Sequence, residues 1–303
     1  MFTRWSVLLF SGAVFVVAAW TAGADKPPAD YRAVSGWPTL PDGLKLGGVS
    51  AVAVDAADRV YLFHRGKTPI LVFDRDGKFL RSWGEGLVKT SHGLRLDRDG
   101  HVWTTDIGHH LVMKFDREGK LLLTLGKKDE PGDTPDKFNK PTDVAVGPNG
   151  EVYVADGYGN ARVVKFSKEG KYLKEWGTKG KGEGQFNLPH AICIDGDGKV
   201  YVGDRENNRV QLFDADGKFL AQWKDSGAPY GLFLKGNGQL LVADGRANEV
   251  RLLDDQGKPV NRWGAKGTGA GQFQMPHWVA VDAQGALYVA EVTGQRVQKF
   301  VLK

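Results

Sequence analysis

The chain has 303 residues, with 41 Lys and Arg against 36 Asp and Glu, and a formal net charge of +5 at pH 7. This modest charge is spread through Lys-rich turns such as 179–181, so the basic patch of a nucleic-acid-binding protein is not expected. The single cysteine, Cys193, cannot form an intramolecular disulfide and is expected to be a small buried hydrophobe. Many of the 41 glycines follow Asp or Asn between apolar runs, which is typical of hairpin turns.

The first 24 residues have the features of a secretory signal peptide. Arg4 precedes an apolar run over 7–20, and the Ala-Gly-Ala sequence at 22–24 matches a cleavage site. The run is short for a membrane span, and an uncleaved N-terminal anchor is the alternative. We expect a signal peptide over 1–24, a mature chain that begins near Asp25, no membrane span after cleavage, and export to the periplasm or the cell exterior.

A unit of four short strands recurs six times beyond residue 47. In the third copy, the expected strands lie at 141–146, 152–156, 162–166 and 172–176. Four short strands about every 40 residues are typical of a β-propeller blade. The sequence therefore predicts an all-β fold, a six-bladed β-propeller over 48–303. An open solenoid is the alternative, although its terminal repeats would need caps.

The two ends of the predicted propeller complement each other. The sixth copy ends after its third strand, at about 297–302, and residues 31–37 have no other partner. We therefore expect the N-terminal segment, 25–47, to supply the missing outer strand of the last blade. Closing the ring in this way removes exposed sheet edges.

A histidine opens every other copy of the repeat. The aligned copies begin at Ser50, His92, Thr142, His190, Tyr230 and His277, and a second shared position follows 14 residues later, at His64, Asp106, Asp156, Asp204, Asp244 and Glu291. Because the first strand of each blade lines the channel, His92, His190 and His277 are expected to converge at its mouth. Three imidazoles with one open position are the ligand set of a catalytic zinc site. Copper and iron also accept imidazole, and Pro-His is alternatively a turn-and-cap device.

Further polar residues follow the second strand on the same face of the ring. Arg65 and Arg205 occupy matching positions in the opposed blades one and four, and Tyr158 lies one residue further along in blade three. Two guanidiniums near a metal indicate a small anionic substrate, because Arg binds a carboxylate through two parallel hydrogen bonds. Each Arg alone is also compatible with a surface ion pair. A phenol near a cation has a lowered pKa, so Tyr158 is a candidate general base.

Two family resemblances follow from these residues. Segments 150–156 and 208–213 resemble the NHL repeat, which implies a six-bladed propeller but no particular function. A closer resemblance, to the peptidylglycine α-amidating lyase family (peptidyl-α-hydroxyglycine α-amidating lyase), is carried by motifs in every blade but the fifth: Phe63-His64-Arg65-Gly66, His92-Gly93-Leu94, 141–146, 156–162, Pro189-His190, 204–207 and Met275-Pro276-His277.

The lyase resemblance implies a zinc-dependent carbon–nitrogen lyase that splits a peptidyl-α-hydroxyglycine into a peptide amide and glyoxylate. It implies that His92, His190 and His277 are the zinc ligands, and that Arg65, Tyr158 and Arg205 are the catalytic and substrate-holding residues. The substrate would be a peptide or a small anionic molecule.

The same resemblance implies a structural calcium ion held by two backbone carbonyls and an Asp. Val52 and Leu94 match the carbonyl positions, but Trp278 stands where the Asp is expected. Calcium prefers several oxygen ligands, often carboxylates. We therefore expect calcium to bind weakly or not at all.

Two other functions fit the sequence. A non-enzymatic, exported NHL propeller would bind a protein or ligand on its top face and would need no metal. A metal-dependent lactonase or esterase is the other alternative, although such propellers usually place Glu, Asp and Asn at the metal. The oligomeric state is not determined by the sequence.

Overall fold

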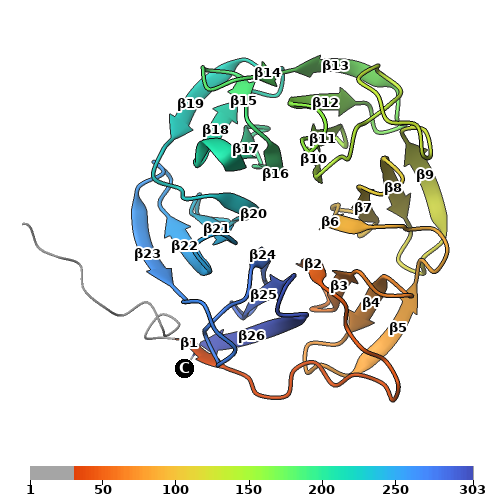
Figure 1. Ribbon diagram of the computed structural model, residues 1–303, viewed down its shortest axis with the longest axis vertical. Helices are drawn as coiled ribbons and strands as arrows, with labels where there is room; N and C mark the ends of the chain where they lie inside the picture. The colour runs from red at the N-terminus through yellow and green to blue at the C-terminus, as the bar shows by residue number, and fades with distance from the viewer. Residues whose placement is uncertain (1–30, 303) are drawn as a thin grey trace, which may run out of the picture.

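The computed structural model describes residues 31–302, and the predicted signal peptide over 1–24 lies outside the described residues. Six four-stranded antiparallel sheets form a ring around a central channel, as Figure 1 shows. The first strands of neighbouring blades contact each other around the whole ring, and the last blade meets the first. The predicted all-β, six-bladed propeller is confirmed.

Each blade contributes four strands in chain order. Blade one contains β2 (Val49–Val54), β3 (Val60–His64), β4 (Ile70–Phe73) and β5 (Phe79–Trp83), and blade two contains β6 (Ser91–Leu96), β7 (Val102–Asp106), β8 (Leu111–Phe115) and β9 (Leu121–Leu125). Blade three contains β10 (Asp143–Val146), β11 (Val152–Asp156), β12 (Arg162–Phe166) and β13 (Tyr172–Trp176), and blade four contains β16 (Pro189–Ile194), β17 (Val200–Asp204), β18 (Arg209–Phe213) and β19 (Phe219–Trp223).

The remaining blades and connections complete the ring. Blade five contains β20 (Pro229–Leu234), β21 (Leu240–Asp244), β22 (Glu249–Leu253) and β23 (Pro259–Trp263), and blade six contains β24 (Pro276–Val281), β25 (Leu287–Glu291), β26 (Arg296–Leu302) and β1 (Tyr31–Ala33). A parallel pair, β14 (Thr178–Lys179) and β15 (Gln185–Phe186), precedes blade four, and a single 3-10 turn, η1 (Arg205–Asn207), follows β17. No helix in residues 31–302 is long and apolar enough to cross a membrane.

Burial changes from the channel to the rim of each blade. All five residues of β11 are buried, whereas residues of β13 alternate between half-buried and exposed. The inner strands are covered on both faces by neighbouring blades, so most of their residues are apolar and buried. The outermost strands cover the core with one face only, which explains their alternating pattern.

The N-terminal strand closes the last blade, as predicted. β1 pairs antiparallel with β26, with Tyr31 opposite Leu302 and Ala33 opposite Phe300. The sheet order is therefore β1-β26-β25-β24. The two ends of the propeller are joined by hydrogen bonds between strands far apart in the sequence, which leaves no unpaired outer edge on β26.

Trp37 seals the junction between blades six and one. In three other blades, a Trp at the end of the fourth strand packs under a turn glycine of the next blade: Trp83 under Gly119, Trp176 under Gly217 and Trp223 under Gly257. Trp37 occupies the equivalent place below Gly77, whose φ is +95° and whose added Cβ would lie 2.7 Å from Trp37 Cδ1. Its ring also lies 5.0 Å from Tyr288, and its Nε1 donates to the Arg75 carbonyl at 3.1 Å.

Trp37→Ala should therefore destabilise the whole ring. Truncating a buried Trp costs about 3–5 kcal/mol, and this side chain is only 7% exposed. Urea unfolding of the mature chain, followed by tryptophan fluorescence and circular dichroism, measures the loss. Leu220→Ala is the matched control, because Leu220 is 47% exposed on an outer strand and its loss should cost less than about 1 kcal/mol. Equal stability of the two variants would contradict closure through Trp37.

Candidate active site

Three imidazoles meet at one end of the central channel. His92 lies in β6, His190 in β16 and His277 in β24, each near the start of the first strand of its blade. Their ring centroids are 4.7 to 5.0 Å apart, and one ring nitrogen from each lies within 4.8 Å of the others. The side chains are 0%, 0% and 2% exposed. The structure thus brings the three predicted metal ligands together.

The alternating blades hold these rings in one orientation. In each case Nδ1 contacts a backbone carbonyl at the first-strand start of the next blade: Thr142 for His92 (2.5 Å), Tyr230 for His190 (2.7 Å) and Ser50 for His277 (2.6 Å). A carbonyl accepts only, so each Nδ1 carries the proton and Nε2 keeps its lone pair. This contact fixes the tautomer and orientation of a metal-ligating histidine. Even blades therefore supply the imidazoles, and odd blades supply the acceptors.

Burial also keeps the three histidines neutral. Removal from water lowers the pKa values of His92 and His190 well below the ordinary value, and lowers the pKa of His277 to about 3. The positive charge of Arg205 adds to the effect on each ring. Neutral imidazole is the form that binds metal. Three such ligands with an open fourth position fit zinc.

Tyr158 contacts two of these imidazoles. It lies in the loop between β11 and β12, and its hydroxyl oxygen is 3.1 Å from Nε2 of both His92 and His190. Burial raises its pKa, and the opposing effect of Arg205 does not overcome this. Burial therefore opposes the predicted lowering of the Tyr158 pKa, because desolvation of the phenolate exceeds the attraction of the guanidinium.

The two predicted arginines lie on the same face as the imidazoles. Arg205, in η1, approaches the Tyr158 hydroxyl with Nη1 at 3.4 Å and donates from Nε to Glu206 at 2.9 Å. Arg65 follows β3 and is exposed, with Nε 3.4 Å from the Ser91 carbonyl. Its charge lowers the pKa values of His92 and His277. Both guanidiniums thus lie close enough to the imidazole cluster for their charge to disfavour its protonation.

Sequence reasoning missed three residues at this site. The Tyr230 ring lies 5.2 Å from that of His190, and the Arg205 guanidinium carbon lies 4.7 Å above it. Glu206 also pairs with Arg246 at 2.8 Å. Tyr230 was visible in the repeat alignment as the first-strand residue of blade five. The Glu206–Arg246 pair joins blades four and five. Neither residue stands out in the repeat pattern of the sequence.

The second repeated position, 14 residues after the first-strand start, connects a loop to the second strand through hydrogen bonds. Asp106 accepts hydrogen bonds from the backbone N–H groups of Lys89 and Thr90 in the preceding loop, and Glu291 accepts one from Gln274. His64 does the same with its Nδ1, which accepts from Gly47. These buried groups therefore satisfy loop N–H donors, which is a structural role.

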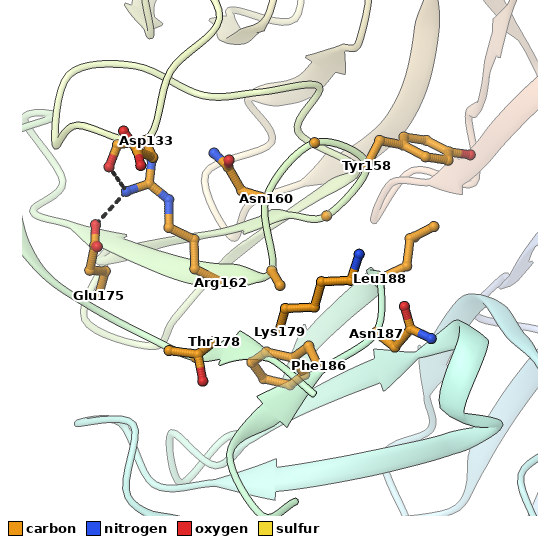
Figure 2. A pocket seen from close by; sticks show the side chains of 14 residues that line it. Asp133, Tyr158, Asn160, Arg162, Glu175, Thr178, Lys179, Phe186, Asn187 and Leu188 are labelled. Carbon is orange, nitrogen blue, oxygen red and sulfur yellow. Dashed lines mark hydrogen bonds and ion pairs between the residues drawn. The ribbon is translucent and has the colours of Figure 1, made fainter. Parts of the chain in front are cut away.

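A cleft of about 540 Å³ lies beside Tyr158. It is bounded by the 157–162 loop, by Thr178 and Lys179 of β14, and by Asn187. Figure 2 shows the Tyr158 ring extending away from Lys179 and from Arg162. Arg162 is held by Glu175 at 2.7 Å, so the exposed Lys179 is the accessible cation of this wall.

The ring of six sheets and its buried three-histidine cluster define a β-propeller with a candidate catalytic metal centre. The NHL repeat family matches residues 138–166 and 186–213. Human NHL repeat-containing protein 3 is 34% identical over 89% of this chain and 84% of that protein. Peptidyl-alpha-hydroxyglycine alpha-amidating lyase 1 of Drosophila melanogaster is 33% identical over 89% of this chain and 60% of that protein. The chain therefore belongs to the family of NHL repeat-containing protein 3, and it is also similar to the peptidyl-α-hydroxyglycine α-amidating lyases.

Two further comparisons set the limits of this relationship. Peptidyl-glycine alpha-amidating monooxygenase B of Xenopus laevis is 33% identical over 87% of this chain, but the chain spans only 35% of that protein. A solved gluconolactonase from Xanthomonas campestris aligns with a TM-score of 0.66 over 86% of this chain and 87% of that chain, at 14% identity. The second likeness concerns the fold alone.

Proposed function

We propose that the protein is a zinc-dependent carbon–nitrogen lyase that cleaves an α-hydroxyglycine unit into an amide and glyoxylate. The observation that carries the proposal is the cluster of three neutral imidazoles with the Tyr158 oxygen 3.1 Å from two of their nitrogens. The 33% identity to the Drosophila amidating lyase supports the reaction class. The apolar run and cleavage motif at the N-terminus support export.

His92, His190 and His277 would hold the zinc ion through Nε2, because each Nδ1 is already engaged with a carbonyl. When bound, the zinc ion supplies Lewis-acid chemistry that lowers the pKa of a hydroxyl group at the site. The protein supplies the orientation of the ligands and a buried setting in which charges interact strongly.

Tyr158 would act as the proton carrier. As a phenolate it accepts the proton of the substrate's α-hydroxyl group, and the oxygen then forms the carbonyl of glyoxylate. The carbon–nitrogen bond breaks with its electron pair going to nitrogen, and Tyr158 returns the proton to that nitrogen. Atoms and charge balance, because the proton moves from oxygen to nitrogen. Burial opposes the phenolate, and Arg205 and Arg65 favour it.

Arg205 and Arg65 would hold the substrate carboxylate. Arg205 is positioned by Glu206, which accepts from its Nε and leaves Nη1 directed at the Tyr158 hydroxyl. A carboxylate bound there would lie beside the reacting carbon. The cleft lined by Asn187 and Lys179 would receive the peptide that precedes the hydroxyglycine.

The test combines metal analysis with product detection. Purified mature protein should contain about one zinc per chain and release glyoxylate from an N-acyl-α-hydroxyglycine, with release lost on chelation and restored by zinc. A reaction without protein corrects for spontaneous decomposition. Zinc content without glyoxylate, together with lactone hydrolysis, would identify a hydrolase instead. Protein without stoichiometric metal and without either activity would identify a binding propeller, which the similarity to NHL repeat-containing protein 3 makes the second candidate.

A further inference from the structure

The side chain of Arg95 extends across the central channel next to the imidazole cluster. Arg95 lies in β6, three residues after His92. Its Nε and Nη2 donate to the two carboxylate oxygens of Asp143 at 3.2 and 2.7 Å, which is a bidentate pair. Its Nη1 donates to the Leu232 carbonyl at 2.9 Å, and Nη2 also donates to the Ile192 carbonyl at 3.1 Å.

This arginine joins five of the six blades. Besides its own strand, it contacts β10 through Asp143, β16 through Ile192 and β20 through Leu232. Its guanidinium carbon lies 4.5 Å from the ring centre of Trp278 in β24, a cation–π contact. These first strands surround the central channel in Figure 1.

The polar groups in the channel satisfy each other. Asp143 is fully buried and also accepts from the backbone N–H groups of Val144 and Ile192, both at 2.8 Å. A buried carboxylate without a cation would be costly, whereas this one has a paired guanidinium and two further donors. The arrangement is not explained by the proposed chemistry, because Arg95 faces the interior of the channel and not the open side of the cluster.

The same repeat positions carry the carbonyls that the lyase resemblance assigns to calcium. Ile192 and Leu232 lie two residues after the aligned strand starts, as Val52 and Leu94 do in blades one and two. At the position of the expected Asp, Trp278 supplies an aromatic face and no oxygen, and a guanidinium already covers that face. A positive charge in place repels a divalent cation, so these residues do not fit calcium.

We propose that Arg95 is a built-in cation of the channel, which binds the Asp143 carboxylate and the Ile192 and Leu232 carbonyls and takes the place of a structural metal ion. The channel then needs no structural metal ion, and the stability of the propeller is independent of calcium. Because the guanidinium is covalently part of the chain, it cannot dissociate as a bound metal ion can. The blades therefore stay connected through Arg95 in media poor in divalent cations.

The test uses the mature, zinc-loaded chain and follows Tm by circular dichroism with and without millimolar calcium chloride. Calcium should leave the wild-type Tm unchanged. Arg95→Ala should lower Tm by about 10 °C, since it leaves the Asp143 carboxylate buried without its partner. Calcium should restore part of this loss, because a carboxylate and two carbonyls then face an empty channel. The double variant R95A/D143N should not respond to calcium.

Arg98→Ala is the matched control, because Arg98 is an exposed residue in the turn after β6 and should change Tm by less than about 2 °C. A wild-type Tm that rises with calcium, or calorimetric binding of a calcium ion, would overturn the proposal. So would R95A that is destabilised without any response to calcium, since Arg95 would then be an ordinary ion pair. If R95A does not fold, two other measurements test the proposal. They are the Tm of Arg95→Lys with and without calcium, and the calcium titration of the wild-type protein. The readout does not depend on lyase activity.

Discussion

His190→Ala should lower the zinc content of the protein to near zero and reduce glyoxylate release by about 1,000-fold or more. Two imidazoles are a poor ligand set for zinc, and His190 also contacts the Tyr158 hydroxyl at 3.1 Å. The substitution therefore disrupts both the metal and the orientation of the proposed proton carrier. Elemental analysis after dialysis and a single-turnover glyoxylate assay measure the two effects separately.

His109→Ala is the control for this change. His109 lies outside the imidazole cluster, in the loop between β7 and β8 of blade two, and pairs with Asp129 at 2.8 Å. Its loss should leave zinc content and glyoxylate release unchanged. If H190A keeps full zinc and full activity while remaining folded, the imidazole cluster is not the metal centre. If H190A loses zinc but keeps activity, metal is not needed for the reaction.

The fold was predictable because each blade repeats the same local pattern. Apolar strands, Asp-Gly or Asn-Gly turns and the missing fourth strand of the last copy together predicted the closed ring, and the pairing of β1 with β26 confirms it. Ring geometry then placed every first-strand start at the channel. The convergence of His92, His190 and His277 follows from that geometry, because equivalent positions of a closed repeat face one axis.

The interactions that tune the site were not predictable in the same way. The pKa of Tyr158 depends on how far packing removes its hydroxyl from water, which periodicity does not report. Arg95 meets partners 48, 97 and 137 residues away in the chain. The cluster of Arg95, Asp143 and Trp278 occurs once in the propeller, so aligning the six repeats with one another does not identify it. Such an alignment finds only the features that the blades have in common.

Tyr158→Phe should reduce kcat for glyoxylate release by about 100- to 10,000-fold, the usual contribution of a positioned acid–base group, while zinc content stays the same. Phenylalanine keeps the ring, which lies 5.2 Å from that of His92, and removes only the oxygen proposed to carry the proton. Steady-state kinetics and elemental analysis of the same preparation separate lost chemistry from lost metal.

Tyr230→Phe tests whether the effect belongs to one hydroxyl or to any phenol at the site. The contacts of Tyr230 with His190 and Arg205 run through its ring and its backbone carbonyl, and both remain in the variant. Its kcat should therefore fall less than about tenfold. Equal losses in the two variants would assign the effect to the general polarity of the pocket. Full activity in Y158F would leave the proton transfer to another group, and the proposed role of Tyr158 would be wrong even if zinc and glyoxylate release were both established.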